Sequence, residues 1–88
     1  MKDKNGKYIT KPRAKQMLCR CIAQSYAKNQ LKTIKPEVVQ EIMNEYKFSR
    51  RSIHDTIICN YHFSDVAERE IFHTTIHNFC YGVLHDGK

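Results

Sequence analysis

Residues 39–58, VQEIMNEYKFSRRSIHDTII, decide the fold that is expected for this 88-residue chain. Apolar residues recur in this stretch every three or four positions, which is typical of amphipathic helices. The pair Lys35-Pro36 marks the start of one helix, which should end near Lys47. Ser49 is expected to cap the next helix. The two apolar stripes consist of Val39, Ile42, Met43 and Tyr46, followed by Ile53, Ile57 and Ile58. The stretch therefore predicts two helices joined by a short turn.

Another helix is predicted before this pair. Pro12 follows Thr10 and Lys11, and proline is tolerated in the first turn of a helix because no intrahelical amide bond is lost there. The helix should run from Pro12 to about Asn29. Its core-facing side is expected to hold Ala14, Met17, Leu18, Cys21, Ile22 and Ser25. Its other faces carry Lys15, Arg20 and Lys28. We therefore expect an amphipathic basic helix.

The C-terminal part is predicted to form a fourth helix. Asp65 with Glu68 three residues later matches a capping box, and Gly82 is the expected end. Residues 7–10 and 59–63 could also pair as two short strands. A chain of 88 residues leaves no room for a second hydrophobic core. The expected fold class is mainly α, a small single-domain bundle of about four helices that contains the helix pair described above.

Residues 39–58 resemble the helix-turn-helix of DNA-binding regulators. Members of that family place an apolar pair early in the first helix, an apolar residue followed by Ser at the end of the turn, and an apolar residue inside the second helix. The residues at these places are Ile42, Met43, Phe48, Ser49 and Ile53. The family usually has a small residue where Met43 stands and Gly where Lys47 stands. The resemblance implies that the helix from Ser49 to Cys59 is a recognition helix.

The resemblance also implies which side chains would meet a partner or DNA near the start of that helix. They are Lys47, Arg50, Arg51, Ser52 and His54. Arg can bond guanine with two hydrogen bonds, and Ser can bond phosphate. The alternative is a plain pair of antiparallel helices, in which Arg50 and Arg51 form a solvated cap.

Basic residues are concentrated in the first part of the chain. Residues 1–35 hold ten Lys or Arg and the single acidic residue Asp3, whereas residues 52–88 carry a net charge of −3. This asymmetry favours an anionic partner for the first part, either nucleic acid or an acidic protein surface, with contacts from Lys15, Arg20 and Lys28. A solvated face without a partner explains the charge equally well. We expect residues 1–11 to be a flexible basic N-terminus.

Cysteine and histidine residues near the C-terminus have the spacing of metal ligands. Residues 59–77 match C-x2-H-x10-H-x3-H, and one more Cys follows. The candidate ligands are Cys59, His62, His73, His77 and Cys80. Tetrahedral zinc needs four nitrogen or sulfur ligands, so we expect one Zn²⁺ that staples the last helix and stabilises a single domain, residues 12–88. The alternative is that these Cys are small buried hydrophobes and the His are core or surface residues.

The sequence also bears on compartment and on chemistry. The longest stretch without Asp, Glu, Lys or Arg runs from Ile71 to His85 and is too polar to span a membrane. The N-terminus lacks an apolar segment typical of an export signal, so we expect a cytoplasmic protein with reduced thiols. A glycine-rich phosphate loop and an H-E-x-x-H motif are absent, so we do not expect an enzyme.

In its general character the chain resembles the small accessory proteins of bacteriophages. Among these are anti-CRISPR proteins, which block RNA-guided nucleases of the Cas9 type by occupying their surfaces. The resemblance implies a non-enzymatic inhibitor whose partner is a bacterial protein that handles nucleic acid, with a Cas9-type nuclease suspected. The alternative function is a helix-turn-helix transcriptional regulator that binds DNA.

Overall fold

The computed structural model describes all residues from Met1 to Lys88 and contains four α-helices, one short 3-10 helix and no strand. The elements are α1 (Lys11–Ala27), η1 (Leu31–Thr33), α2 (Pro36–Tyr46), α3 (Arg50–Asn60) and α4 (Val66–Gly82). The prediction of a mainly helical bundle is confirmed. The predicted pairing of residues 7–10 with residues 59–63 is wrong. Tyr8 forms only an isolated bridge with Lys2, while residues 59 and 60 continue the hydrogen-bonded backbone of α3.

The helix ends follow from local signals in the sequence. The Ser49 hydroxyl accepts a hydrogen bond from the Ser52 amide at 3.1 Å, which caps α3. Asp65 Oδ1 accepts hydrogen bonds from two amides in the first turn of α4, at 2.8 and 3.3 Å. These bonds satisfy amide groups that have no partner inside the helix. As predicted, α4 ends at Gly82.

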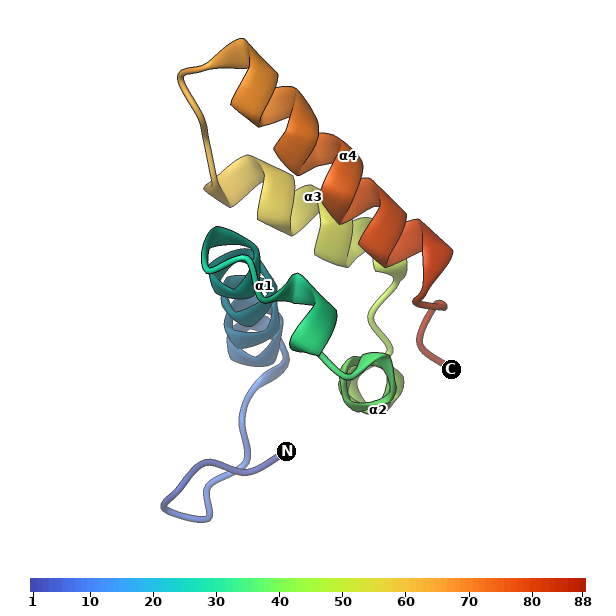
Figure 1. Ribbon diagram of the computed structural model, residues 1–88. Coiled ribbons are helices and arrows are strands. Elements are labelled where there is room, and N and C mark those ends of the chain that lie inside the picture. The colour runs from blue at the N-terminus through green and yellow to red at the C-terminus, as the bar shows by residue number, and fades with distance from the viewer.

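The central element is α3, which packs against α1 on one side and α4 on another (Figure 1). The helices α3 and α4 lie side by side and run in opposite directions, whereas α2 lies across the start of α3. Because α3 contacts both longer helices, only a narrow part of its surface is left to solvent. None of the four helices combines the length and the apolar composition needed to cross a membrane.

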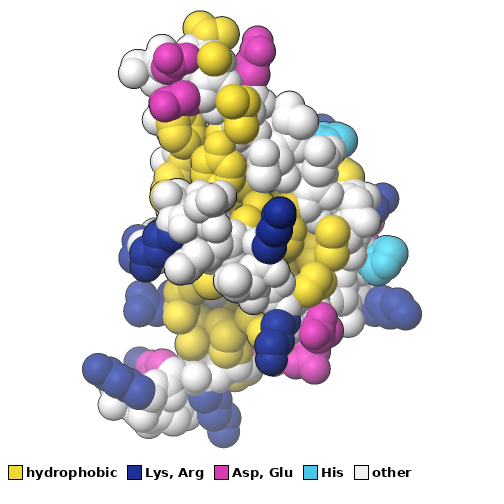
Figure 2. Space-filling view, viewed as in Figure 1, with side chains coloured by type: hydrophobic (Ala, Val, Ile, Leu, Met, Phe, Trp, Pro, Cys, Tyr) yellow, Lys and Arg dark blue, Asp and Glu magenta, His cyan; other side chains and the backbone are white.

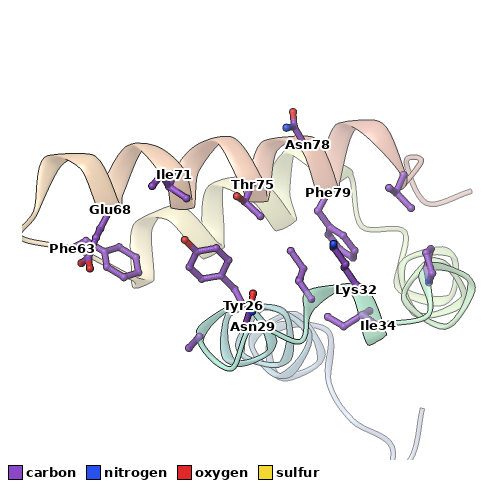
Figure 3. A pocket seen from close by; sticks show the side chains of 14 residues that line it. Tyr26, Asn29, Lys32, Ile34, Phe63, Glu68, Ile71, Thr75, Asn78 and Phe79 are labelled. Atoms are coloured by element: carbon purple, nitrogen blue, oxygen red, sulfur yellow. The ribbon is translucent and has the colours of Figure 1, made fainter.

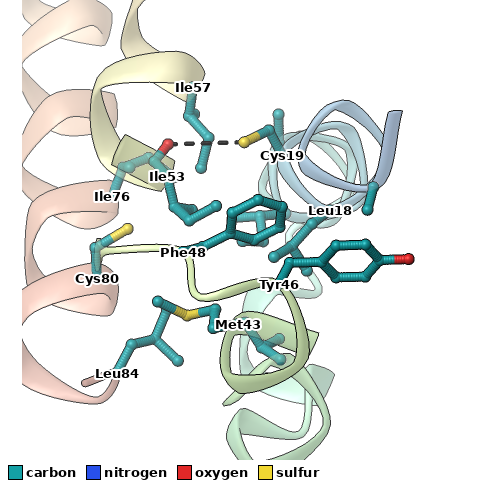
Figure 4. Close-up of a cluster of buried hydrophobic side chains, with 14 of the residues drawn as sticks. Leu18, Cys19, Met43, Tyr46, Phe48, Ile53, Ile57, Ile76, Cys80 and Leu84 are labelled. Carbon is teal, nitrogen blue, oxygen red and sulfur yellow. Dashed lines mark hydrogen bonds between the residues drawn. The ribbon is translucent and has the colours of Figure 1, made fainter. Parts of the chain in front are cut away.

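The core is one cluster of 16 buried hydrophobic side chains, drawn in part in Figure 4. The turn between α2 and α3 inserts Phe48, which is 2% exposed, and its ring stacks on Tyr46 with centroids 5.4 Å apart. From α3, Ile53 and Ile57 are completely buried. The turn therefore joins α1, α2 and α3 in one hydrophobic core instead of forming a surface loop.

The thiol of α1 that enters the core is that of Cys19, not that of Cys21 as predicted. Cys19 is 2% exposed and lies within 3.7 Å of the Ile53 carbonyl oxygen (Figure 4), whereas Cys21 is exposed. The two residues differ by about 200° around the helix, so only one of them can face the core. The buried side of α1 is centred nearer to Ile22 and Ala23 than the sequence suggested.

Residues 1–11, expected to be a flexible basic N-terminus, include a segment that packs on α2. Ile9 is 5% exposed, and its carbonyl oxygen accepts a hydrogen bond from the Tyr46 hydroxyl at 2.6 Å. The N-terminal amine contacts the Glu45 carboxylate. This positive neighbour is the largest cause of a lowered pKa for Glu45. The first residues therefore cover one side of α2.

Candidate partner-binding surfaces

The five predicted zinc ligands do not come together. No group of three or more His, Cys, Asp or Glu side chains is placed to hold a metal ion. Cys59 is exposed at the end of α3 and Cys80 is completely buried. His62 is exposed in the loop after α3, His73 is half-buried, and His77 is exposed on α4. These donors do not fit a tetrahedral zinc site.

Helical geometry explains why the ligands are dispersed. His77 and Cys80 are separated by about 60° around α4. The buried side of that helix is centred near Ile76, so Cys80 points into the core and His77 lies at its outer edge. His54 lies opposite His77, with ring centroids 5.8 Å apart. Cys59 is five residues, or about 7.5 Å, farther along α3 and on its exposed side.

Three of the predicted site residues, His54, His77 and Arg50, instead meet Tyr81 between α3 and α4. The ring centroids of His54 and Tyr81 are 5.5 Å apart, and those of His77 and Tyr81 are 4.7 Å apart. The Arg50 guanidinium lies 5.3 Å from the Tyr81 ring centroid, which suits a cation–π contact. Sequence reasoning missed Tyr81. Tyr81 lies four residues after His77, and His54 lies four residues after Arg50, so each pair lies on one side of its helix. Whether the two pairs face each other depends on the register of α3 against α4.

The turn between α2 and α3 contains a left-handed residue that is not glycine. Lys47 has φ 57° and ψ 43°, the left-handed conformation, at the position where the family usually has Gly. Phe48 then enters the core and Ser49 caps α3. Because roughly a third to a half of all helices end in a left-handed residue, this turn fits a plain pair of helices as well as the helix-turn-helix.

The C-terminal tail covers the start of α3. Asp86 Oδ1 accepts a hydrogen bond from the Arg50 amide at 3.0 Å and lies 3.9 Å from Arg50 Nε. The Gly87 amide donates to the Phe48 carbonyl oxygen at 2.7 Å. A Cβ at Gly87 would collide with the backbone oxygens of Met43 and Phe48, the second at 2.8 Å. A carboxylate thus sits where the resemblance would place a DNA phosphate or base.

Of the remaining predicted contacts, only Arg51 lies on the narrow exposed stripe of α3. Arg51 is 83% exposed, and its Nε lies 3.7 Å from Asp55 Oδ2. Asp55 and Cys59 complete the stripe, while Ser52 is half-buried. Lys47 is exposed in the turn. The stripe therefore carries one cation, and that cation already has an acidic neighbour.

A larger set of exposed cations lies on α1. We use the name basic face of α1 for the exposed residues Arg13, Met17, Arg20, Gln24 and Lys28. They recur at spacings of three or four residues, so Arg13, Met17, Arg20 and Gln24 share one side of the helix over about 16 Å, and Lys28 follows directly after its end. Cys21 is exposed next to them. Lys15 does not belong to this face, because it is half-buried with its ammonium 5.6 Å from the Phe48 ring centroid.

These cations have no acidic partners within the chain. No Lys or Arg in residues 1–35 forms an ion pair with a carboxylate. No acidic residue occurs between Asp3 and Glu37, so the positive potential over the basic face of α1 is not neutralised locally.

No protein-family model, curated protein or solved structure matches the chain.

Proposed function

We propose that this chain is a non-enzymatic binding module that inhibits bacterial nucleic-acid machinery, in the manner of anti-CRISPR proteins. Its partner is a Cas9-type nuclease in the bacterial cytoplasm. The chain acts by occupying a surface of that nuclease with the basic face of α1. The observation that carries the proposal is the group of exposed, unpaired cations on that face.

The composition of the basic face of α1 supports contact with a protein. Its Arg13, Arg20 and Lys28 side chains suit carboxylates of an acidic surface patch. Met17, 43% exposed, lies among them and adds an apolar contact that a phosphate backbone would not use. Arginine and methionine are both enriched in protein interfaces.

The test is a target-cleavage assay with a Cas9-type nuclease, its guide RNA and increasing amounts of the purified chain. We expect the wild-type chain to block cleavage, and the double variant Arg13→Glu, Arg20→Glu to need at least about tenfold more protein for the same effect. The matched control is Arg69→Glu with Lys88→Glu, which makes the same change in net charge away from α1. The proposal would be refuted if both double variants lost inhibition of cleavage equally, or if the wild-type chain inhibited no such nuclease.

A second candidate function is a DNA-binding regulator, favoured by the left-handed turn at Lys47 and the capped helix that follows. Binding through α3 would require the C-terminal tail to leave, because Asp86 occupies the start of that helix. This candidate predicts that Asp86→Asn increases affinity for duplex DNA in a gel-shift titration. It also predicts that Arg51→Ala removes any preference among duplex sequences. Weak binding by both the wild type and Asp86→Asn would exclude it.

A further inference from the structure

An apolar groove of about 1040 Å³ runs between α4 and the segment that joins α1 to α2 (Figure 3). On one wall, Ile71, Thr75 and Phe79 of α4 recur at helical spacing. Tyr26 and Leu31 belong to the opposite wall. Thr75 is the smallest of these three α4 side chains.

The groove has no cover within the chain. Ile71 is 60% exposed and Val83 is 44% exposed, which is high for large apolar side chains that are grouped together. The N-terminal segment packs on α2, and the C-terminal tail is bonded to the turn before α3, so neither end reaches the groove. Figure 2 shows hydrophobic side chains exposed along this part of the surface. Within residues 1–88 nothing covers these side chains, which favours an occupant with an apolar surface of its own.

The length of the groove fits a helix. Its α4 wall extends from Glu68 to Val83, a rise of about 22 Å along the helix axis. A bound helix of about 14 residues has the same length and presents an apolar stripe along one side. Helix-in-groove docking of this kind uses anchors at positions i, i+4 and i+7.

The charges along the groove give the bound helix a direction. Glu68 lies beside Phe63 at one end, and Lys32 lies near Phe79 toward the other (Figure 3). Neither Glu68 nor Lys32 forms an ion pair within the chain. The acidic side chains that gather where α4 begins are visible in Figure 2, with Lys and Arg lower on the same face. A helix has a partial positive charge at its N-terminus and a partial negative charge at its C-terminus.

We infer that the groove binds an amphipathic helix of a partner protein, with its N-terminus and a basic residue over Glu68 and its C-terminus and an acidic residue over Lys32. This inference goes beyond the proposed function and does not depend on the basic face of α1. The groove is a second binding surface, and it is apolar, whereas the basic face of α1 is charged. Its occupant is defined by its apolar stripe and by the order of its charges.

The probe is a 14-residue amphipathic peptide with leucines on one face, two lysines at its N-terminus and two glutamates at its C-terminus. A side-chain cross-link holds it helical, because these terminal charges oppose the helix dipole in the free peptide. A second peptide of identical composition has the lysines and glutamates exchanged. Fluorescence anisotropy with the full-length chain should show at least about tenfold tighter binding of the first peptide. The charge-exchanged chain Lys32→Glu, Glu68→Lys should reverse this preference. Equal binding of both peptides would contradict the inferred direction.

The apolar contact is tested with two substitutions on the same helix. Ile71→Asp should weaken binding of the preferred peptide at least about tenfold, because it places a charge in the groove. Val66→Asp is the matched control, because Val66 is 56% exposed on α4 but does not line the groove. Both variants change only exposed residues, and circular dichroism should show that they fold. Unchanged peptide affinity in Ile71→Asp would overturn the inference. A dimer of the wild type that Ile71→Asp abolishes would also overturn it, in favour of a second copy as occupant.

Discussion

Replacing Lys47 by Gly should stabilise the protein, because this residue adopts a left-handed conformation that costs a non-glycine residue free energy. Its φ of 57° and ψ of 43° place it at the end of α2, where glycine is the usual residue. The left-handed conformation costs an L-residue roughly 1–2 kcal/mol. Glycine loses roughly 0.5–1 kcal/mol more backbone entropy than other residues on folding. The expected net gain is about 0.5–1 kcal/mol.

The assay is thermal unfolding of Lys47→Gly followed by circular dichroism. A gain of this size should raise the melting temperature by roughly 2–8 °C in a domain of this length. The Lys47 side chain is exposed and takes part in no ion pair, so its removal should cost little. Lys47→Ala is the control, because it removes the same charge and keeps the free-energy cost of a left-handed non-glycine residue.

A second control uses the other left-handed residue that is not glycine. Asn29 has φ 55° after the end of α1, and asparagine tolerates this conformation better than lysine. Asn29→Gly should therefore raise the melting temperature less than Lys47→Gly. If Lys47→Gly is no more stable than Lys47→Ala, the left-handed turn in front of α3 is not a feature of this protein.

Four other results are expected. In the native protein, iodoacetamide should label Cys21 and Cys59 but not Cys19 and Cys80, whose thiol pKa values burial raises to about 12 and 11. Because the folded protein holds these two protons more tightly than the unfolded chain, its free energy of unfolding should decrease as the pH rises above about 9. A flat alkaline titration would contradict this. Gly87→Ala should lower stability by about 1–3 kcal/mol in urea unfolding, because its Cβ collides with two backbone oxygens. EDTA should leave the melting temperature unchanged, and one equivalent of bound zinc whose removal by EDTA lowers the melting temperature would contradict the dispersed ligands.

The helix boundaries could be predicted because each depends on residues close in sequence. Proline in the first turn, the hydroxyl of Ser49, the carboxylate of Asp65 and the position of Gly82 act within a few residues of the helix end that they mark. These signals do not depend on how the helices pack. For that reason the four helices predicted from the sequence occur in the structure in the predicted order.

The surfaces could be predicted less well because they depend on how the helices are rotated and paired. Periodicity defined an apolar side of α1 but did not locate its centre, so Cys21 was assigned to the core in place of Cys19. The zinc ligands matched in spacing, yet the register of α3 against α4 separates Cys59 from His77. The contact between Asp86 and the Arg50 amide joins residues that are 36 positions apart. No local pattern could have indicated it.

Cys21 offers a direct measurement of the proposed contact between the basic face of α1 and a Cas9-type nuclease. Its thiol is exposed beside Arg20 and Met17, whereas the thiol of Cys59 is exposed on α3. The measurement is the alkylation rate of both thiols, with and without the purified nuclease, after digestion of all unprotected nucleic acid. We expect the nuclease to slow alkylation of Cys21 at least about tenfold and to leave the rate at Cys59 unchanged. Protection of Cys59 alone, or of neither thiol, would contradict the proposed contact.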